Sequence, residues 1–332
     1  MSGVSQKLLF TGLGLMVGLL TLASLLIGPA GFSIADSLSA LFGGTGDAVS
    51  LVMQEIRLPR ALLAIMVGIS LGLSGAALQG YLRNPLAEPG LIGVSSSAAL
   101  GAVVTLQTGL AAQMMFALPF FGLFGAGVAV VLLLLLAGPR GGSLTLILAG
   151  IAISALAAAL TSLVLNLSPN PFATSEIVFW MLGSLADRSF SHIIIALPFM
   201  VLGWILILST SRGLDALILG EDAAASLGIN LTRLRWVLVL GVAACTGAAT
   251  SVVGAIGFVG LVVPHILRPF VGARPSRLLP ASALGGAALV LAADIAARII
   301  LPDRDLKLGV VMAIIGAPVF LHLIYRTRRA EL

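Results

Sequence analysis

The longest uncharged stretch of this chain sets its fold class. No Asp, Glu, Lys or Arg occurs from residue 89 to residue 139, nor from residue 141 to residue 175. A helix of roughly 20 apolar residues crosses a bilayer core about 30 Å thick, so the first stretch alone can hold two crossings. Only 9% of the 332 residues are charged, whereas soluble proteins are about one quarter charged. The sequence therefore predicts an all-α polytopic membrane protein and excludes a water-soluble enzyme.

Ten segments are candidate spans, and we treat 1–332 as one transmembrane domain. They cover residues 8–28, 61–80, 92–108, 114–137, 143–165, 192–209, 236–253, 257–270, 279–299 and 308–325. The third and the eighth are short and interrupted by Gly or Pro. Broken hydrophobic segments in transporters tend to line a cavity, because freed backbone groups would be unsatisfied in lipid.

An even number of spans places both termini on one side of the membrane. The cations on that side are Lys7, Arg83, Arg140, Arg212, Arg233, Arg235, Arg268, Arg274, Arg277, Arg326, Arg328 and Arg329. The opposite side carries Arg57, Arg60, Arg188, Arg298, Arg304 and Lys307. Because cytoplasmic loops are enriched in Lys and Arg, we expect both termini in the cytoplasm. The same scatter of single cations makes membrane orientation a better reading of the pI of 10.3 than nucleic-acid binding.

The sequence lacks a site for hydrolysing ATP. A phosphate-cradling loop requires a Gly-Lys pair, but the two lysines, Lys7 and Lys307, follow Gln6 and Leu306. An ATPase would therefore be a separate chain. The alternative is an ion-coupled secondary carrier, which would be expected to bury acidic side chains at mid-membrane. Asp294 is the only carboxylate well inside a predicted span, and Arg298 lies one turn later, so a structural pair is at least as plausible.

A membrane enzyme is a third reading with less support. The sequence shows no nucleophile paired with a base. The single cysteine, Cys245, lies in an apolar run, and the three histidines, His192, His265 and His322, lie in separate segments without metal-ligand spacing. We therefore predict no metal site and no bound cofactor.

One polar connection, residues 219–235, is long enough to contact a cytoplasmic partner. Glu221 and Asp222 precede three alanines, and anions are favourable at a helix N-terminus. Gly228 fits a helix stop, and Asn230 or Thr232 could begin another helix. The pattern predicts two short helices at the membrane face, with a plain solvated loop as the alternative.

Several motifs, in order along the chain, resemble the FecCD-type permeases, the membrane subunits of type II ABC importers. Any one is weak, but together they extend from about residue 55 to 325. The matching segments are residues 57–60 (RLPR), 72–75 (GLSG), 83–95 (RNPLAEPGLIGVS), 148–152 (LAGIA), 180–185 (WMLGSL), 219–221 (LGE), 257–268 (GFVGLVVPHILR), 293–298 (ADIAAR) and 316–320 (GAPVF).

The resemblance implies a homodimer of ten-helix subunits in the bacterial inner membrane, with two cytoplasmic ATPase subunits that use ATP and a periplasmic substrate-binding protein. It implies that Arg57, Arg60 and Arg298 meet glutamates of the binding protein. It assigns coupling helices to about residues 219–233 and a translocation path to six residues between 83 and 97. The coupling residues are Leu219, Gly220, Glu221, Asp222, Ala223, Ala224, Leu227 and Gly228, and the path residues are Arg83, Asn84, Pro85, Ser95, Ser96 and Ser97.

The cargo implied by the resemblance is a metal chelate. Residues 87–95 look most like haem and cobalamin permeases, and iron–siderophores are also carried in the family. His265 is better read as a polar helix residue than as a haem ligand. Three positions depart from the family pattern: Lys307 replaces a proline, Ser97 a glycine and Phe190 a tryptophan.

Overall fold

The computed structural model describes residues 3–28, 31–43, 48–114, 116–138, 142–168, 171–301 and 306–330, and every regular element in them is a helix. Eight helices are long and apolar enough to cross a membrane. They are α1 (Gly3–Leu26), α4 (Leu58–Leu82), α7 (Ala117–Ala137), α8 (Ser143–Asn166), α10 (Phe190–Ser209), α13 (Leu231–Val253), α15 (Pro275–Ile300) and α16 (Leu308–Ala330).

Two apolar helices are shorter. The segments α5 (Val94–Gln107) and α14 (Val259–Val271) have 14 and 13 residues, fewer than a bilayer crossing needs. They correspond to the third and eighth predicted spans, so all ten predicted segments are helical. The remaining short elements are α2 (Ile34–Phe42), α3 (Ala48–Leu51), a π-helical turn (Val52–Arg57), a 3₁₀ turn (Pro89–Ile92), α6 (Leu110–Gln113), α9 (Pro171–Met181), α11 (Ser211–Leu217) and α12 (Glu221–Ser226).

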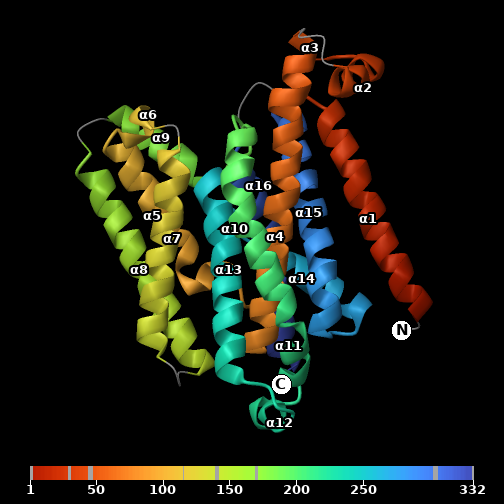
Figure 1. The fold of residues 1–332 in the computed structure, drawn as a ribbon, viewed down its shortest axis with the longest axis vertical. Coiled ribbons are helices and arrows are strands. Elements are labelled where there is room, and N and C mark those ends of the chain that lie inside the picture. The colour runs from red at the N-terminus through yellow and green to blue at the C-terminus, as the bar shows by residue number, and fades with distance from the viewer. Residues whose placement is uncertain are drawn as a thin grey trace.

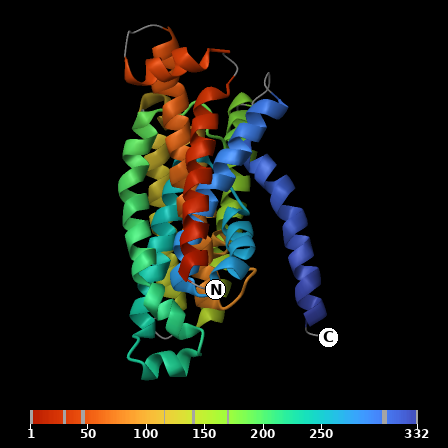
Figure 2. The same cartoon turned by 90° about the vertical axis from the view of Figure 1, so that its right-hand side faces the viewer.

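Both termini lie at one end of the helical bundle, together with α12 (Figures 1 and 2). We call this end the terminal face, and the end that carries α2 and α3 the opposite face. The shared position of the termini agrees with an even number of crossings. Of the cations counted for orientation, Arg140 and Arg304 lie outside the described residues, as do the side chains of Arg326, Arg328 and Arg329.

Helix α4 is the centre of the bundle because small residues let neighbouring backbones touch it. A side chain at Gly68, Gly72 or Gly75 would collide with the backbone of α15 or α14, at Gly286, Ser282 and Gly260 respectively. The glycines of the second predicted span thus serve ordinary intramembrane packing.

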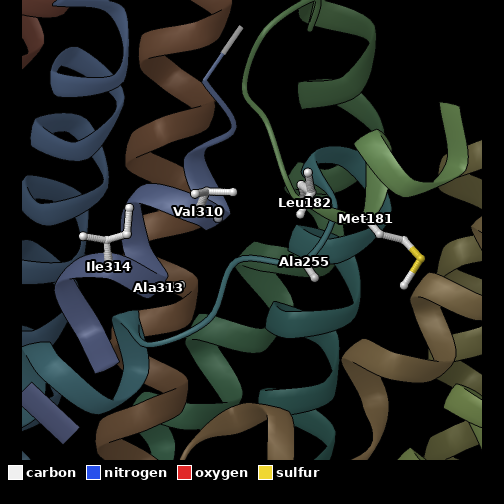
Figure 3. Close-up of a pocket in the computed structure, with 7 residues that line it drawn as sticks. Met181, Leu182, Ala255, Val310, Ala313 and Ile314 are labelled. Carbon is white, nitrogen blue, oxygen red and sulfur yellow. The ribbon is translucent and has the colours of Figure 1, made fainter. Parts of the chain in front are cut away.

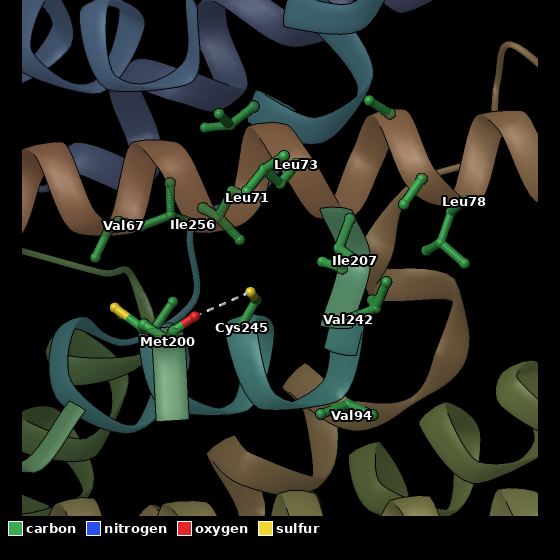
Figure 4. Packing of buried hydrophobic residues seen from close by; sticks show 14 of the residues in the cluster. Val67, Leu71, Leu73, Leu78, Val94, Met200, Ile207, Val242, Cys245 and Ile256 are labelled. Carbon is green, nitrogen blue, oxygen red and sulfur yellow. Dashed lines mark hydrogen bonds between the residues drawn. The ribbon is translucent and has the colours of Figure 1, made fainter. Parts of the chain in front are cut away.

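On its other side α4 packs against α10 and α13 around a continuous apolar core (Figure 4). Cys245 of α13 is fully buried there and its thiol lies 3.9 Å from the Met200 carbonyl oxygen of α10 (Figure 4). Trp204 of α10 donates its indole N–H to the Ser70 hydroxyl of α4 at 2.9 Å. The core therefore satisfies these polar groups, as burial requires.

Helices α8 and α16 leave apolar side chains exposed. Leu144 and Leu163 of α8 are 68% and 52% exposed, and Ile314 and Leu321 of α16 are 68% and 67% exposed. Toward its C-terminal end α16 diverges from the rest of the bundle (Figure 2). These surfaces lie against lipid or another chain.

Candidate docking and translocation sites

At the opposite face, two arginines hold one buried carboxylate. Asp294 of α15 has a side chain that is 1% exposed. Arg60 of α4 donates Nε and Nη2 to Asp294 Oδ1 at 3.0 and 2.8 Å, and Arg298 Nη2 lies 3.0 Å from Asp294 Oδ2. The predicted pair one helical turn apart is confirmed, and a cation from another helix joins it.

The same cluster caps the end of α1. Arg298 Nη1 donates to the carbonyl oxygens of Ser24 and Ile27 at 3.0 and 2.7 Å. Arg57 Nη1 donates to the carbonyl oxygens of Leu25 and Leu26 at 2.9 and 3.1 Å. The last carbonyls of a helix have no partner within the helix and carry its negative dipole end, so these cations stabilise the C-terminus of α1.

The structure thus corrects how the three candidate docking arginines are presented. Arg57 is 4% exposed, and the side chains of Arg298 and Arg60 are 9% and 19% exposed. All three lie together at the opposite face, as expected, but they do not extend free guanidinium groups into solvent. Their contacts with α1 have no signal in the sequence, because Ser24 and Arg298 are 274 residues apart.

A second cluster joins the two short helices inside the bundle. The segment before α5 places the Glu88 carboxylate against the start of α14, where Glu88 Oε1 accepts the Phe258 N–H at 2.5 Å. Phe258 has a φ of 67°, in the left-handed region that is rare for a bulky residue. A carboxylate at a helix N-terminus is favoured by the dipole, so Glu88 stabilises this bend.

Phe258 also packs against α16. Its ring lies against Gly316, where any side chain would overlap it. Leu86 from the Glu88 segment packs beside Phe258 together with Val319 of α16. Glu88 was present in the matched 83–95 motif, but its role had no sequence signal because the partner is a backbone N–H 170 residues away.

The candidate path residues separate into three environments. Arg83 ends α4 in a left-handed conformation and lies exposed at the terminal face, where its Nη2 is 3.8 Å from Glu221 Oε1 of α12. Asn84 Oδ1 accepts the Leu86 N–H at 2.9 Å and shapes the turn that follows, which includes the half-buried Pro85. The side chains of Ser95 and Ser96 are half-buried at the start of α5.

Ser97 is more buried than Ser95 and Ser96. It is 8% exposed, and its carbonyl lies directly against Gly125 of α7. In this conformation Ser97 belongs to the α5–α7 contact and does not line an open path.

An apolar cavity of about 450 Å³ lies between α9, the segment that precedes α14, and the start of α16 (Figure 3). Its lining consists of Met181, Leu182, Ala255, Gly309, Val310, Ala313 and Ile314. None of these side chains is charged, so this open pocket offers a ligand an apolar surface with few directional contacts. The sequence offered no way to select these residues from the many other apolar ones.

At the terminal face, the segment 219–235 contains one of the two predicted short helices. Helix α12 begins at Glu221, ends before Gly228, which has a φ of 81°, and buries only Ala224. Asn230 Oδ1 accepts the Arg233 N–H at 2.9 Å and starts the next helix. The prediction of two short helices is wrong, because the second is the beginning of the long α13.

The exposed residues of this segment include two large apolar side chains. Leu219 and Leu227, which flank α12, are 69% and 64% exposed. Gly220 has a φ of 106°, which permits the sharp turn into α12. Glu221 and Asp222 are exposed in the first turn, and Ala223 is half-buried. This segment offers both apolar and acidic contacts to another protein.

The remaining departures have local roles. Lys307 Nζ lies 5.8 Å from the centroid of the Phe179 ring of α9, a cation–π distance. Phe190 starts α10 and packs against the main core.

His265 lies half-buried within α14. Among the described residues, no three His, Cys, Asp or Glu side chains form a group that could hold a metal ion.

Comparison with known proteins identifies the family to which this architecture belongs. The family model of the FecCD transport family matches residues 15–326. The Fe(3+) dicitrate transport system permease protein FecD of Escherichia coli (strain K12) is 42% identical over 83% of this chain and 86% of its own length. The hemin transport system permease protein HmuU of Yersinia pestis is 38% identical over 86% of each chain.

A solved structure agrees with the sequence relatives. It is described as an inward-facing conformation of a putative metal-chelate type ABC transporter, and it is 33% identical with a TM-score of 0.86 over 96% of this chain and 99% of that chain. This chain is therefore a transport subunit of the membrane, without an ATPase of its own, and it belongs to the FecCD transport family.

Proposed function

We propose that this chain is the permease subunit of an ATP-driven importer that moves a bulky metal chelate from the periplasm to the cytoplasm by alternating access. The exposed α12 segment carries the proposal. It presents Leu219, Glu221 and Leu227 at the face where the termini lie, and the sequence has no nucleotide loop of its own. The terminal face is then cytoplasmic, and α12 is the contact for a separate ATPase.

The ion pair between Arg83 and Glu221 supports a coupling role for α12. It joins α12 to the segment that carries Glu88, and Glu88 in turn holds the bend before α14. A displacement of α12 by ATP binding could thus reach the wall of the apolar cavity. Such a displacement would shift the equilibrium between inward-open and outward-open states.

Copurification tests this contact. The substitution pair Leu219→Ser/Leu227→Ser should abolish retention of the ATPase subunit, because it removes the exposed apolar contacts without touching the core. The matched control Leu8→Ser/Leu19→Ser changes leucines of α1 that are 75% and 67% exposed and should retain the ATPase. Retention by the α12 variant would refute the assignment.

We further propose that two copies assemble with the path between them, each copy with its own ATPase. The exposed apolar faces of α8 and α16 support this, and the cavity beside α16 would then open toward the second copy. Crosslinking single cysteines at Ile314 in a Cys245→Ser background tests the assembly. A crosslinked dimer is expected, and an exclusively monomeric chain would contradict the proposal.

The opposite face is the proposed docking surface for a periplasmic binding protein. Arg57, Arg60 and Arg298 would supply its cations, and a guanidinium suits bidentate pairing with a carboxylate. Because these groups bind α1 and Asp294 in this conformation, docking would require some of them to be released. Arg57→Glu/Arg60→Glu should abolish stimulation of ATP hydrolysis by the binding protein. Unchanged stimulation in a folded variant would refute the docking role.

The cargo class is an iron complex, with haem preferred and cobalamin as the other outcome. The relatives named for hemin and for Fe(3+) dicitrate support an iron chelate, and the apolar cavity suits a large ligand that is held weakly. Uptake of labelled haem, ferric siderophore and cobalamin by a strain with only this system identifies the cargo. Transport of an unchelated ion alone would contradict the proposal.

A further inference from the structure

An apolar groove on the outside of the bundle is separate from all the sites above. It lies between α1, α14 and α15, has a volume of about 260 Å³, and includes Leu13, Met16, Ile266, Leu267 and Ala292 in its walls. The floor is formed at Gly285, where a side chain would come within 2.7 Å of Leu267 Cδ1. The groove is too small for a second helix, whose diameter is about 10–12 Å, but it suits one slender apolar chain.

Two cations lie at the end of this groove that faces the terminal side. Arg274 is exposed and Arg277 half-buried at the start of α15, on the side of the helix that carries Gly285 and Ala292 further along. With the Gln6 amide turned over, its oxygen accepts hydrogen bonds from Arg277, which links α1 to this corner. Within the part of the chain that the structure describes, no carboxylate forms an ion pair with either arginine.

The nearby acid Asp215 offsets only part of this charge. Its Oδ1 accepts the Ser276 N–H at 2.9 Å, at the N-terminus of α15. One carboxylate against two guanidinium groups leaves this corner with a net positive charge.

The spacing along the helices fits half a bilayer. At 1.5 Å per residue, Gly285 lies about 12 Å along α15 from Arg277. Half of a hydrocarbon core is about 15 Å thick. A phosphate at the two arginines would thus place its acyl chain in the groove.

We propose that this groove binds one anionic phospholipid of the leaflet at the terminal face. The phosphate contacts Arg274 and Arg277, and one acyl chain lies along Met16, Ile266 and Ala292. The lipid stabilises the packing of α1 against α14 and α15 at this end. The arginine cluster stabilises the other end of α1. The site does not depend on which cargo the protein carries.

Native mass spectrometry of the full-length chain in detergent tests the proposal, with dioleoyl phosphatidylglycerol and dioleoyl phosphatidylcholine as probes. We expect one phosphatidylglycerol to be retained preferentially. Arg274→Gln/Arg277→Gln should weaken its binding roughly 30-fold, which corresponds to about 2 kcal/mol. The control Arg212→Gln/Arg233→Gln removes two exposed cations elsewhere on the same side and should leave this binding unchanged.

Two further variants test the acyl-chain seat. Ala292→Phe fills the groove, and Met16→Trp blocks it from a position that is 42% exposed, without entering the core. Either variant should lose the retained lipid while keeping both arginines. Equal binding of the two lipids, an equal loss in the control, or full binding in both blocked variants would overturn the proposal.

Discussion

Asp294→Asn tests the arginine cluster at the opposite face. The substitution keeps the size of a side chain that is 1% exposed but leaves two arginines without their shared counter-charge. Removing one partner of a buried ion pair typically costs about 3–5 kcal/mol. Because the Arg60 side chain is 19% exposed and can reach water, we expect the lower end, about 3 kcal/mol of lost stability.

The assay is equilibrium unfolding of the purified chain in mixed detergent, followed by circular dichroism. Glu221→Gln is the matched control, because it breaks an exposed pair with a separation of 3.8 Å, and such pairs contribute about 0–1 kcal/mol. The double variant Asp294→Asn/Arg60→Met removes a partly buried cation together with its partner and leaves the Arg298 bonds to α1 in place, so it should recover part of the loss. Equal effects of Asp294→Asn and Glu221→Gln would refute the reasoning.

Three further predictions concern the interior. Glu88→Ala removes the acceptor of the Phe258 N–H and should reduce transport severely, whereas Glu88→Gln retains an acceptor oxygen and should keep most of it; equal uptake by the two variants would contradict this role. Gly316→Leu should displace α16 from the Phe258 ring and increase crosslinker access near the cavity, while the exposed control Leu321→Ala should not. Gly72→Leu forces α4 and α15 apart and should prevent accumulation of folded protein in the membrane, and normal accumulation would show that this contact can adjust.

The helical segments could be predicted from the sequence because lipid imposes a simple length and polarity rule. Runs without charge marked the crossings, and Gly or Pro interruptions marked the two short helices α5 and α14. Local capping was also readable: Gly228 and Asn230 end and begin helices where their chemistry predicts. The predicted second short helix failed because Asn230 caps a span that starts earlier than its apolar run.

The contacts across the bundle could not be predicted in the same way. Arg57 and Arg298 were recognised as unusual, but their bonds to the end of α1 join residues far apart in sequence. Glu88 binds a backbone N–H, which any residue except proline can offer. The cavity lining is apolar like most of the chain, so composition could not distinguish it from lipid-facing surface.

Reconstituted transport tests the central claim most directly. The chain is placed in liposomes with or without its ATPase partner, and uptake of a labelled chelate delivered by the binding protein is followed with and without ATP. We expect uptake only when the ATPase and ATP are both present. Uptake by this chain alone, driven by a proton or sodium gradient in ATP-free liposomes, would contradict it and identify an ion-coupled carrier.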